Sequence, residues 1–491
     1  MRLTKAKYVE IMSPQTVDAK GRSVNSIFCK GSRIGAAFLT TCGSLPLVVA
    51  AESAKPNVLF IITDDQGFSD FGFTGNPLVK TPNIDRLAAQ SAVFENFVVA
   101  PACSPSRAAF YTGRDHLHTG VWGVPPRDNL GTDEALLPAF FKASGYKTFY
   151  AGKRDMGSPP NSTPWERGWD NGYFVSGYQH RDPTLPNRGA TINPKGWTCD
   201  IMTDLILDFW KQNPDGPWLA TAAYIIPHLP FVCDESYMAP FLEKGLSADL
   251  ALCYGSIAQL DAAIGRLLDG LNESGQADNT IVVLVSDNGM SRKTNSGQEY
   301  SKDDWAIRDF HKLRGEKATA WENGIRVPCL IRWTGKISPG KRPQLGAAED
   351  LLPTMLDLAG VSPDGISHLP FTGVSLCPAL DNAAAEVQHP DLFRMAISGS
   401  GSPRNLVAGQ LRKFEDHHLT LQGPRFKYHA LPGGKCALYD LVADPGESMD
   451  VQDKFPEVVA GKAEEIRKRW DELIAEGRCF IPVADTGKKK K

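Results

Sequence analysis

The run Pro-Asn-Val-Leu-Phe-Ile-Ile-Thr-Asp-Asp at residues 56–65 decides how this chain is expected to fold. Apolar residues fill positions 58–62 without alternation, and the carboxylates of Asp64 and Asp65 follow. Such a run is typical of a strand buried on both faces of a parallel sheet. Functional side chains in open α/β sheets gather at the carboxyl ends of the strands. The run therefore predicts a central parallel strand that delivers Asp64 and Asp65 to a site.

Further runs of this kind alternate with helical patterns along the chain. Strands are expected at residues 147–151, 218–226 and 279–285. Helices are expected at residues 82–94, 136–145, 201–212, 248–274 and 351–360, and a loop that borders the site at residues 289–314. This alternation predicts an α/β fold with a mostly parallel central sheet covered by helices on both faces.

The composition changes near the C-terminus, after a segment rich in Gly and Pro at residues 361–380. Short alternating runs separated by turn residues at 391–445 predict a small antiparallel sheet, and residues 458–476 form a polar amphipathic helix pattern. We therefore expect a catalytic α/β domain at residues 52–385 and a smaller α+β domain at residues 386–491.

The first 51 residues have the pattern of an export signal. Basic residues, among them Lys5, Lys7, Lys20, Arg22, Lys30 and Arg33, precede an uncharged apolar stretch at 34–51, and small residues end it. Gly43 and Pro46 interrupt the stretch, which favours cleavage over a retained membrane helix. A threonine before Cys42 makes lipoprotein anchoring there the less favoured alternative. We expect a periplasmic or secreted protein, and no later segment has the pattern of a stable membrane span.

Composition excludes some classes of function. The chain has 491 residues, of which 42% are hydrophobic and 22% charged, with a formal net charge of -3. This near-neutral balance argues against a nucleic-acid binder, so any anion site must be local. Ten cysteines are scattered, and no C-x-x-C pair suggests a zinc site.

A second stretch carries the chemistry: Cys103-Ser104-Pro105-Ser106-Arg107, followed by Thr112-Gly113-Arg114. It resembles the signature of the type I, formylglycine-dependent sulfatases, which are arylsulfatase-like members of the alkaline phosphatase superfamily. The resemblance implies that a maturation enzyme converts Cys103 to formylglycine. One hydroxyl of the hydrated aldehyde would attack sulfur, and the other would allow sulfate to leave. Cys103 has no adjacent base of the kind that ordinary covalent catalysis requires.

The same resemblance implies a metal site. Asp64 and Asp65 match the first ligand pair of the family, Asp287 and Asn288 match the second, and residue 103 completes the set. Three carboxylates and an amide oxygen suit calcium or magnesium and are poor ligands for copper or zinc. The family implies Ca²⁺, with Mg²⁺ as the alternative.

Four more residues match basic positions of the family. Arg107 is expected to hold the formylglycine diol and Lys153 to hold the sulfate. His228, in Pro-His-Leu-Pro, and Lys317, in the segment 313–319, are expected to contact the ester oxygen and to protonate the leaving alcohol. Cationic donors are what the transition state of sulfate transfer needs.

One position departs from the family. Where Gly-Lys-Trp-His is usual, this chain has Gly152-Lys153-Arg154-Asp155, so Asp155 replaces the histidine that helps to release sulfate. An aspartate there would be repelled by an anionic intermediate or would hold its own proton. His116 and His118 could compensate, although surface or core roles are equally open.

These patterns together predict a sulfuric ester hydrolase that releases inorganic sulfate. A carbohydrate sulfate is preferred over a small aryl sulfate, because several side chains could stack on sugar rings: Trp122, Trp165, Trp169, Tyr178, His180, Arg181, Trp197 and Trp305. The alternatives are a phosphonate or phosphate ester hydrolase of the same superfamily, a weakly active binder of sulfated ligands because of Asp155, and a thiol enzyme using unmodified Cys103.

Overall fold

The structure is a computed structural model, which describes residues 55–124, 130–154, 161–175, 177–397 and 413–478. The described residues belong to one compact unit, Ser53–Lys491. The predicted export segment at 1–51, including Cys42, lies outside the described residues. Within the described residues, every helix is too short or too polar to cross a membrane.

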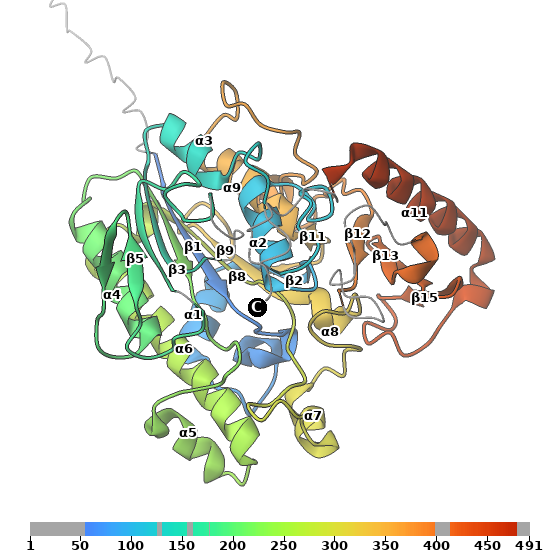
Figure 1. Cartoon of the computed structure of the whole chain (residues 1–491), viewed down its shortest axis with the longest axis horizontal. Coiled ribbons are helices and arrows are strands. Elements are labelled where there is room, and N and C mark those ends of the chain that lie inside the picture. Colours follow the sequence, from blue (N-terminus) through green and yellow to red (C-terminus); the bar gives the residue numbers. More distant parts are fainter. Residues whose placement is uncertain (1–54, 125–129, 155–160, 176, 398–412, 479–491) are drawn as a thin grey trace, which may run out of the picture. The chain divides into compact units, whose positions relative to one another are not determined.

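A nine-stranded sheet is the framework of the larger part of the chain (Figure 1). β1 (Asn57–Thr63) lies between β8 (Thr280–Ser286) and β7 (Trp218–Ala223) and is parallel to both. The strand order is β10-β2-β9-β8-β1-β7-β3-β4, with β11 beside β2. Only β9 (Arg326–Arg332) is reversed among these described strands, running antiparallel to β2 and β8. The predicted mostly parallel sheet is confirmed.

The other elements have the following bounds. The remaining strands of this sheet are β2 (Ala92–Val98), β3 (Lys147–Lys153), β4 (Asn171–Val175), β10 (Gly340–Arg342) and β11 (Gly346–Ala347), and a hairpin is formed by β5 (Leu185–Asn187) and β6 (Ala190–Ile192). The helices before the C-terminal sheet are α1 (Pro82–Ala89), α2 (Cys103–Thr112), α3 (Leu137–Ala143), α4 (Thr198–Lys211), α5 (Glu235–Leu242), α6 (Ala248–Glu273), α7 (Lys302–Arg308), α8 (Glu322–Ile325), α9 (Leu351–Ala359) and α10 (Cys377–Asp381).

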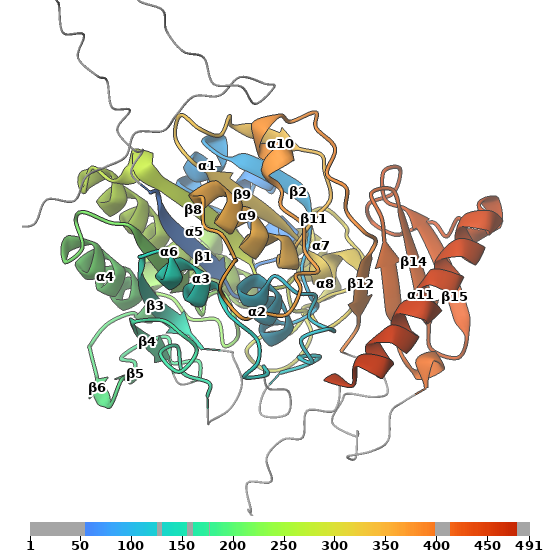
Figure 2. The same cartoon turned by 90° about the horizontal axis from the view of Figure 1, so that it is seen from above.

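Helices cover both faces of the sheet, as the alternation of patterns predicted (Figure 2). All seven residues of β1 are buried, and their side chains alternate between two core clusters. Phe60 belongs to the cluster that includes residues of α2, α3 and α9, whereas Ile61 belongs to the one that includes residues of α1, α4 and α6. Burial on both faces explains why the β1 sequence is continuously apolar.

The register of the strands places their carboxyl ends together. Thr63 of β1 pairs with Ser286 of β8, and Ala223 of β7 pairs with both Ile62 and Gly152. The residues that follow β1, β8 and β3 therefore reach one edge of the sheet. This edge carries the predicted site residues.

A second sheet follows near the C-terminus. β12 (Leu392–Met395), β13 (Leu419–Gln422), β14 (Phe426–Leu431) and β15 (Lys435–Asp440) pair antiparallel in that order, and α11 (Pro456–Glu476) packs on them. Ile466, Trp470 and Leu473 of α11 share a separate core with this sheet. The predicted antiparallel sheet with a helix is confirmed.

Two predicted elements differ from the structure. The helix expected at residues 82–94 ends at Ala89, and β2 begins at Ala92. Val93 and Phe94, at the end of the predicted helix, instead pair with Leu330 and Cys329 of β9. Pairing with a distant strand outweighs local spacing for β-branched and aromatic residues.

The loop predicted at residues 289–314 contains a helix, α7. Its first N–H groups are capped by Ser301, whose hydroxyl accepts a hydrogen bond from the backbone N–H of Asp304 at 3.0 Å. Trp305 and Arg308 of α7 are buried against the rest of the chain. The polar composition concealed a helix that tertiary contacts stabilise.

Candidate active site

The thiol of Cys103 sits at the first position of α2, and 2% of the residue is exposed. Pro105 lies in the first turn, where a helix needs no N–H donor. Arg107 follows one turn later and therefore lies on the same face of the helix as Cys103. The spacing of the motif thus places a thiol and a guanidinium side by side at the sheet edge.

The Thr112-Gly113-Arg114 tail ends and anchors α2. Gly113 adopts a left-handed conformation with φ of 66°, and a Cβ at this position would lie 3.0 Å from Phe371. Arg114 forms ion pairs with Glu134 at 3.3 Å and with Glu476 at 3.0 Å. The tail fixes the far end of the helix that presents Cys103.

The predicted metal ligands come together around Cys103. Its Sγ lies 3.4 Å from Asp64 Oδ1 and 3.8 Å from Asp65 Oδ1. The backbone N–H of Asp65 donates to Asp287 Oδ1 at 3.2 Å, and Asn288 Nδ2 donates to Asp65 Oδ1 at 2.8 Å. Two segments more than two hundred residues apart, at the ends of β1 and β8, therefore meet at the thiol.

The donor set fits a hard divalent cation. Asn288 Oδ1 is buried and accepts no hydrogen bond within the part of the chain that the structure describes. Ligand atoms of Asp64, Asp65, Cys103 and His228 all lie within 4.8 Å of one another. Carboxylate and amide oxygens at this density suit calcium or magnesium. His228, expected only as a catalytic residue, thus also lies within reach of the metal ligands.

Three cationic side chains face the three carboxylates. Arg107 Nη2 lies 2.8 Å from Asp287 Oδ2, and Lys153 Nζ lies 2.7 Å from Asp64 Oδ2. Gly152, before Lys153, is required because a Cβ there would lie 1.8 Å from the carbonyl oxygen of Ala223.

Lys317 reaches the same place from a loop. Its Nζ lies 2.5 Å from Asp65 Oδ1 and 3.4 Å from Cys103 Sγ. Its backbone N–H donates to the carbonyl oxygen of Met290 at 2.8 Å, and that of Ala318 donates to Pro101 at 2.7 Å. The loop is thereby held to the segments after β8 and before α2.

Burial dominates the electrostatics of this cluster. It raises the pKa of the Cys103 thiol well above its usual value, although Lys153 and Lys317 oppose the shift. Burial, together with the charge of Asp64, raises the pKa of Asp287 to about 6. The thiol is therefore protonated at neutral pH, which makes it a weak nucleophile.

His228 is held as a neutral ring. Burial lowers its pKa to about 4 against the opposing charge of Asp65. Nδ1 lies 2.5 Å from the carbonyl oxygen of Leu229, so Nδ1 carries the proton in the neutral ring and donates it. Nε2 lies 3.7 Å from Asp65 Oδ2 and therefore faces the cluster.

Several other predicted residues fall elsewhere. Asp155 lies outside the described residues. His118 pairs with Glu476 of α11 at 2.6 Å. His116 is buried, and its Nδ1 lies 3.5 Å from Asp115. Both ion pairs are made away from the carboxylate cluster.

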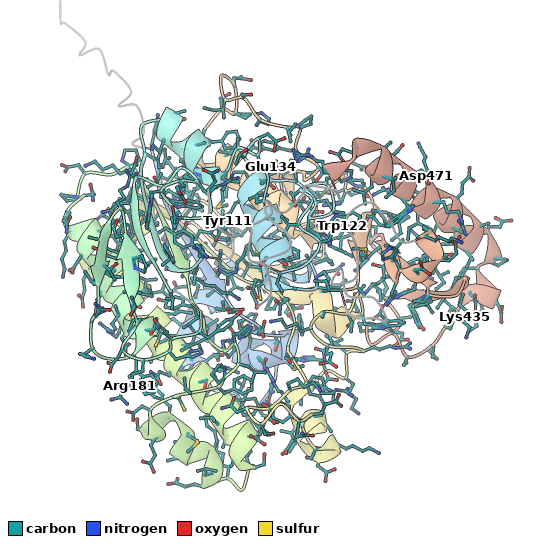
Figure 3. All side chains as sticks on the ribbon, in the orientation of Figure 1. Tyr111, Trp122, Glu134, Arg181, Lys435 and Asp471 are labelled. Atoms are coloured by element: carbon teal, nitrogen blue, oxygen red, sulfur yellow. The ribbon has the colours of Figure 1, made fainter. Side chains whose placement is uncertain are left out.

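The aromatic residues proposed as sugar contacts divide into two groups. Trp169 and Trp122 are 0% and 5% exposed, and Trp122 lies between α2 and the C-terminal sheet (Figure 3), so their assignment as sugar contacts is wrong. Tyr178 is 40% exposed and its ring stacks on that of His228. The sequence indicated Tyr178 as a possible sugar contact but did not indicate its stacking on His228, because this contact joins the ends of two different strands.

Comparison with known proteins identifies the family. The sulfatase family model matches residues 56–361. The chain belongs to the sulfatase family. It is 29% identical over 461 residues to arylsulfatase A of Bos taurus, a match that covers 83% of this chain and 85% of that protein. It is 32% identical over 354 residues to N-acetylgalactosamine-6-sulfatase of Homo sapiens, with 66% of each covered.

Solved structures share the fold of this chain. The structure named Ps i-CgsB is 25% identical, with a TM-score of 0.73 and coverage of 84% of this chain and 92% of that one. A phosphonate monoester hydrolase of Agrobacterium radiobacter is 21% identical, with a TM-score of 0.63 and coverage of 85% and 96%, a likeness that shows the fold alone. The family model and the two curated relatives show that the chain is an enzyme that hydrolyses sulfate esters.

Proposed function

We propose that this sulfatase uses a formylglycine made from Cys103 and a divalent cation, Ca²⁺ or Mg²⁺, to release inorganic sulfate from a sulfated carbohydrate. The observation that carries the proposal is the environment of the Cys103 thiol. It is buried and protonated, and three carboxylates and the unpartnered oxygen of Asn288 lie around it. A thiol in this state is unsuited to attack, whereas a hydrated aldehyde supplies a hydroxyl nucleophile and a second hydroxyl that allows sulfate to leave.

The cation site would be formed by Asp64, Asp65, Asp287, Asn288 and residue 103. Their hard oxygens and close packing support this set. When bound, the cation would supply Lewis-acid stabilisation of the charge that develops on the sulfate oxygens.

The basic residues would bind and orient the reacting groups. Arg107, one helical turn from Cys103 and paired with Asp287, would hold the diol. Lys153 and Lys317 would bind sulfate oxygens, since both amines lie on the carboxylates nearest the thiol. Lys317 would deliver the proton to the leaving alcohol, and His228 would face the ester oxygen with Nε2 beside it. Asp155 stays a candidate for receiving the proton when sulfate is released.

A carbohydrate substrate is supported by the names of relatives. An ulvan-active sulfatase of Formosa agariphila is 29% identical over 423 residues, with 80% of this chain and 76% of that one covered. The Ps i-CgsB protein was also solved with a neocarrahexaose. Export, suggested by the pattern of residues 1–51, and conversion of Cys103 by a formylglycine-generating enzyme belong to the same proposal.

Sulfate release tests the proposal directly. Purified protein, produced together with a formylglycine-generating enzyme, is incubated with sulfated oligosaccharides and with an aryl sulfate, and free sulfate is measured by ion chromatography. We expect release that the Cys103→Ala variant lacks. Binding without release would favour the sulfated-ligand binder, and faster hydrolysis of a matched phosphate ester would favour the phosphoesterase.

A further inference from the structure

Arg308, in α7, is a fully buried cation outside the site cluster. Its side chain and that of Asp70 are both 0% exposed, and its Nη2 lies 2.9 Å from Asp70 Oδ2. Its Nε donates to the other carboxylate oxygen of Asp70 at 3.2 Å, so the pair is bidentate. Its Nη1 donates to the carbonyl oxygen of Ser291 at 3.0 Å. The guanidinium therefore joins two segments that are far apart in sequence.

Asp70 belongs to the segment that carries the first pair of predicted metal ligands. Its Oδ2 accepts a hydrogen bond from the backbone N–H of Gly67 at 3.1 Å, and its carbonyl oxygen accepts one from Gln66 Nε2 at 3.0 Å. Gln66 directly follows Asp65 in the sequence. The ion pair with Arg308 is thereby connected to the turn that begins at the metal ligands.

Ser291 belongs to the segment that carries the second pair of predicted ligands, three residues after Asn288. The two segments pack backbone against backbone. A Cβ on Gly67 would lie 2.9 Å from the backbone nitrogen of Met290, so a larger residue would push the segments apart. A shift of one segment therefore displaces the other, and Arg308 restrains both.

A third segment touches the same guanidinium. Arg308 Cζ lies 5.4 Å from the centroid of the Phe231 ring, within the range of cation–π attraction. Phe231 follows His228 by three residues in the segment after β7. One side chain thus contacts the three segments that follow β1, β7 and β8, and these segments carry the predicted ligands and His228.

We propose that Arg308 is a positioning residue of the cation site, which holds the ligand-bearing segments at the spacing that a cation requires. The three carboxylates of Asp64, Asp65 and Asp287 repel one another when no cation is bound, so the surrounding chain must resist their separation. Ligands that are held in place before binding give a higher affinity. The inference rests on the proposed function, because it assumes that these carboxylates bind a cation.

Cation affinity tests this role without relying on activity. Metal-free, full-length protein is titrated with Ca²⁺, and separately with Mg²⁺, by calorimetry at a temperature at which circular dichroism shows each variant to be folded. Arg308→Met should weaken binding of the cation about 10- to 100-fold. Arg308→Lys keeps a positive charge for Asp70 but lacks the fork that also reaches Ser291, so it should fold and weaken binding about 3- to 10-fold.

Lys427→Met is the matched control. It also removes a cation from buried carboxylates, because Lys427, Glu322 and Glu447 are all 0% exposed. It should therefore destabilise the fold in the same way but leave the dissociation constant of the cation within about 2-fold of the parent. Hydrogen exchange of the metal-free proteins gives a second readout. Residues 64–70 and 287–291 should exchange faster in Arg308→Met and at the parental rate in Lys427→Met.

The outcomes separate the inference from the proposed function. Parental cation affinity in Arg308→Met, or an equal loss in Lys427→Met, would overturn the role of Arg308 and leave the cation site in place. Parental exchange of residues 64–70 and 287–291 in Arg308→Met would do the same. A parent protein that binds neither Ca²⁺ nor Mg²⁺ would overturn the cation site, and the inference with it.

Discussion

Two buried clusters of charge share one segment, residues 313–328, which supplies Lys317 to one and Glu322 to the other, and they differ in their exposure to solvent. The site cluster consists of Cys103 with Asp64, Asp65, Asp287, Asn288, Arg107, Lys153 and Lys317. The C-terminal cluster consists of Lys427, Glu322, Glu447, His429 and His418.

The C-terminal cluster is enclosed. Lys427 Nζ lies 2.9 Å from Glu322 and 3.1 Å from Glu447, and all three side chains are 0% exposed. His429 Nε2 lies 2.8 Å from Glu447 Oε1, and the ring of Trp321 stacks on that of His429 with centroids 4.1 Å apart. Glu322 begins α8. Through Glu322, this cluster joins residues 313–328, the segment that also carries Lys317, to the C-terminal sheet.

The site cluster is open on one side. The side chain of Lys317 is 19% exposed and that of His228 beside it is 15% exposed, and Asn288 Oδ1 accepts no hydrogen bond among the described residues. An enclosed network stabilises the native state, whereas a network that reaches solvent can receive a ligand. Substitutions in the site cluster should therefore change activity, and substitutions in the C-terminal cluster should change stability.

The largest expected effect is that of Cys103→Ser. Serine fills the same place at the start of α2 but gives no aldehyde, so turnover should fall by more than about a thousandfold. Steady-state sulfate release measures the loss, and thermal melting should match the parent. A variant that keeps a tenth of the parental rate would place the nucleophile elsewhere.

Removal of the cation is the next test. Chelation should abolish activity and lower the free energy of unfolding by about 3 kcal/mol if the cation was present at a hundred times its dissociation constant. Differential scanning calorimetry with and without chelator measures this shift. Asp65→Asn is the matched control, because its melting should respond less to the chelator. An unaltered shift in Asp65→Asn would show that the stabilising cation binds elsewhere.

The Lys427→Met variant should show most clearly that the C-terminal cluster supports stability and not activity. It leaves Glu322 and Glu447 buried without their cation, which should destabilise the fold by about 3–5 kcal/mol. Denaturant unfolding measures the loss, and the activity of the folded fraction should stay within about threefold, since Lys427 has no contact with the thiol. Lys341→Met, which removes an exposed ion pair with Glu95, is the control and should cost less than about 1 kcal/mol. Equal losses in the two variants would remove the distinction between clusters.

Local sequence predicted the strands and motifs that form the site better than it predicted the contacts there between residues distant in sequence. The apolar run of β1 and the carboxylates after it indicated both the central strand and the edge where functional groups meet, because these properties depend on neighbours in sequence. The Cys103 motif indicated chemistry through resemblance. It did not reveal that Cys103 begins a helix, which is what places Arg107 beside it.

What the sequence missed depends on distant contacts. The first residues of β2 fell within the predicted helix, and they form a strand through pairing with β9 and β10. Tyr178 and His228 meet because β4 and β7 end at the same edge. Lys427 appears in a short alternating run whose pattern predicts a strand, but nothing near it indicates Glu322, which lies 105 positions earlier.

The smallest expected effect is a pH dependence of stability near the C-terminal sheet. Burial alone would lower the pKa of His389. The hydrogen bond and the charge of Asp350 outweigh burial and raise this pKa to about 9. The unfolded value is about 6.5, so this stabilisation is complete below that pH and is lost as the pH rises through 9. Burial also raises the pKa of Asp350, which opposes the gain, so we expect a loss on the order of 1–2 kcal/mol.

Melting temperatures between pH 7 and pH 10 measure this loss, and His389→Gln should flatten the curve over that range. Activity at saturating substrate should not follow the same curve, because the His389–Asp350 pair lies at the start of α9 and not at the thiol. A parental slope retained in His389→Gln would assign the titration to another group.

The most direct test of the central claim is the mass of the tryptic peptide that contains residue 103, taken from a preparation with measured sulfatase activity. Conversion to formylglycine replaces sulfur and two hydrogens with one oxygen. We predict that the converted fraction of the peptide rises and falls with the specific activity of the preparation. An active preparation in which residue 103 is entirely an unmodified cysteine would contradict the account.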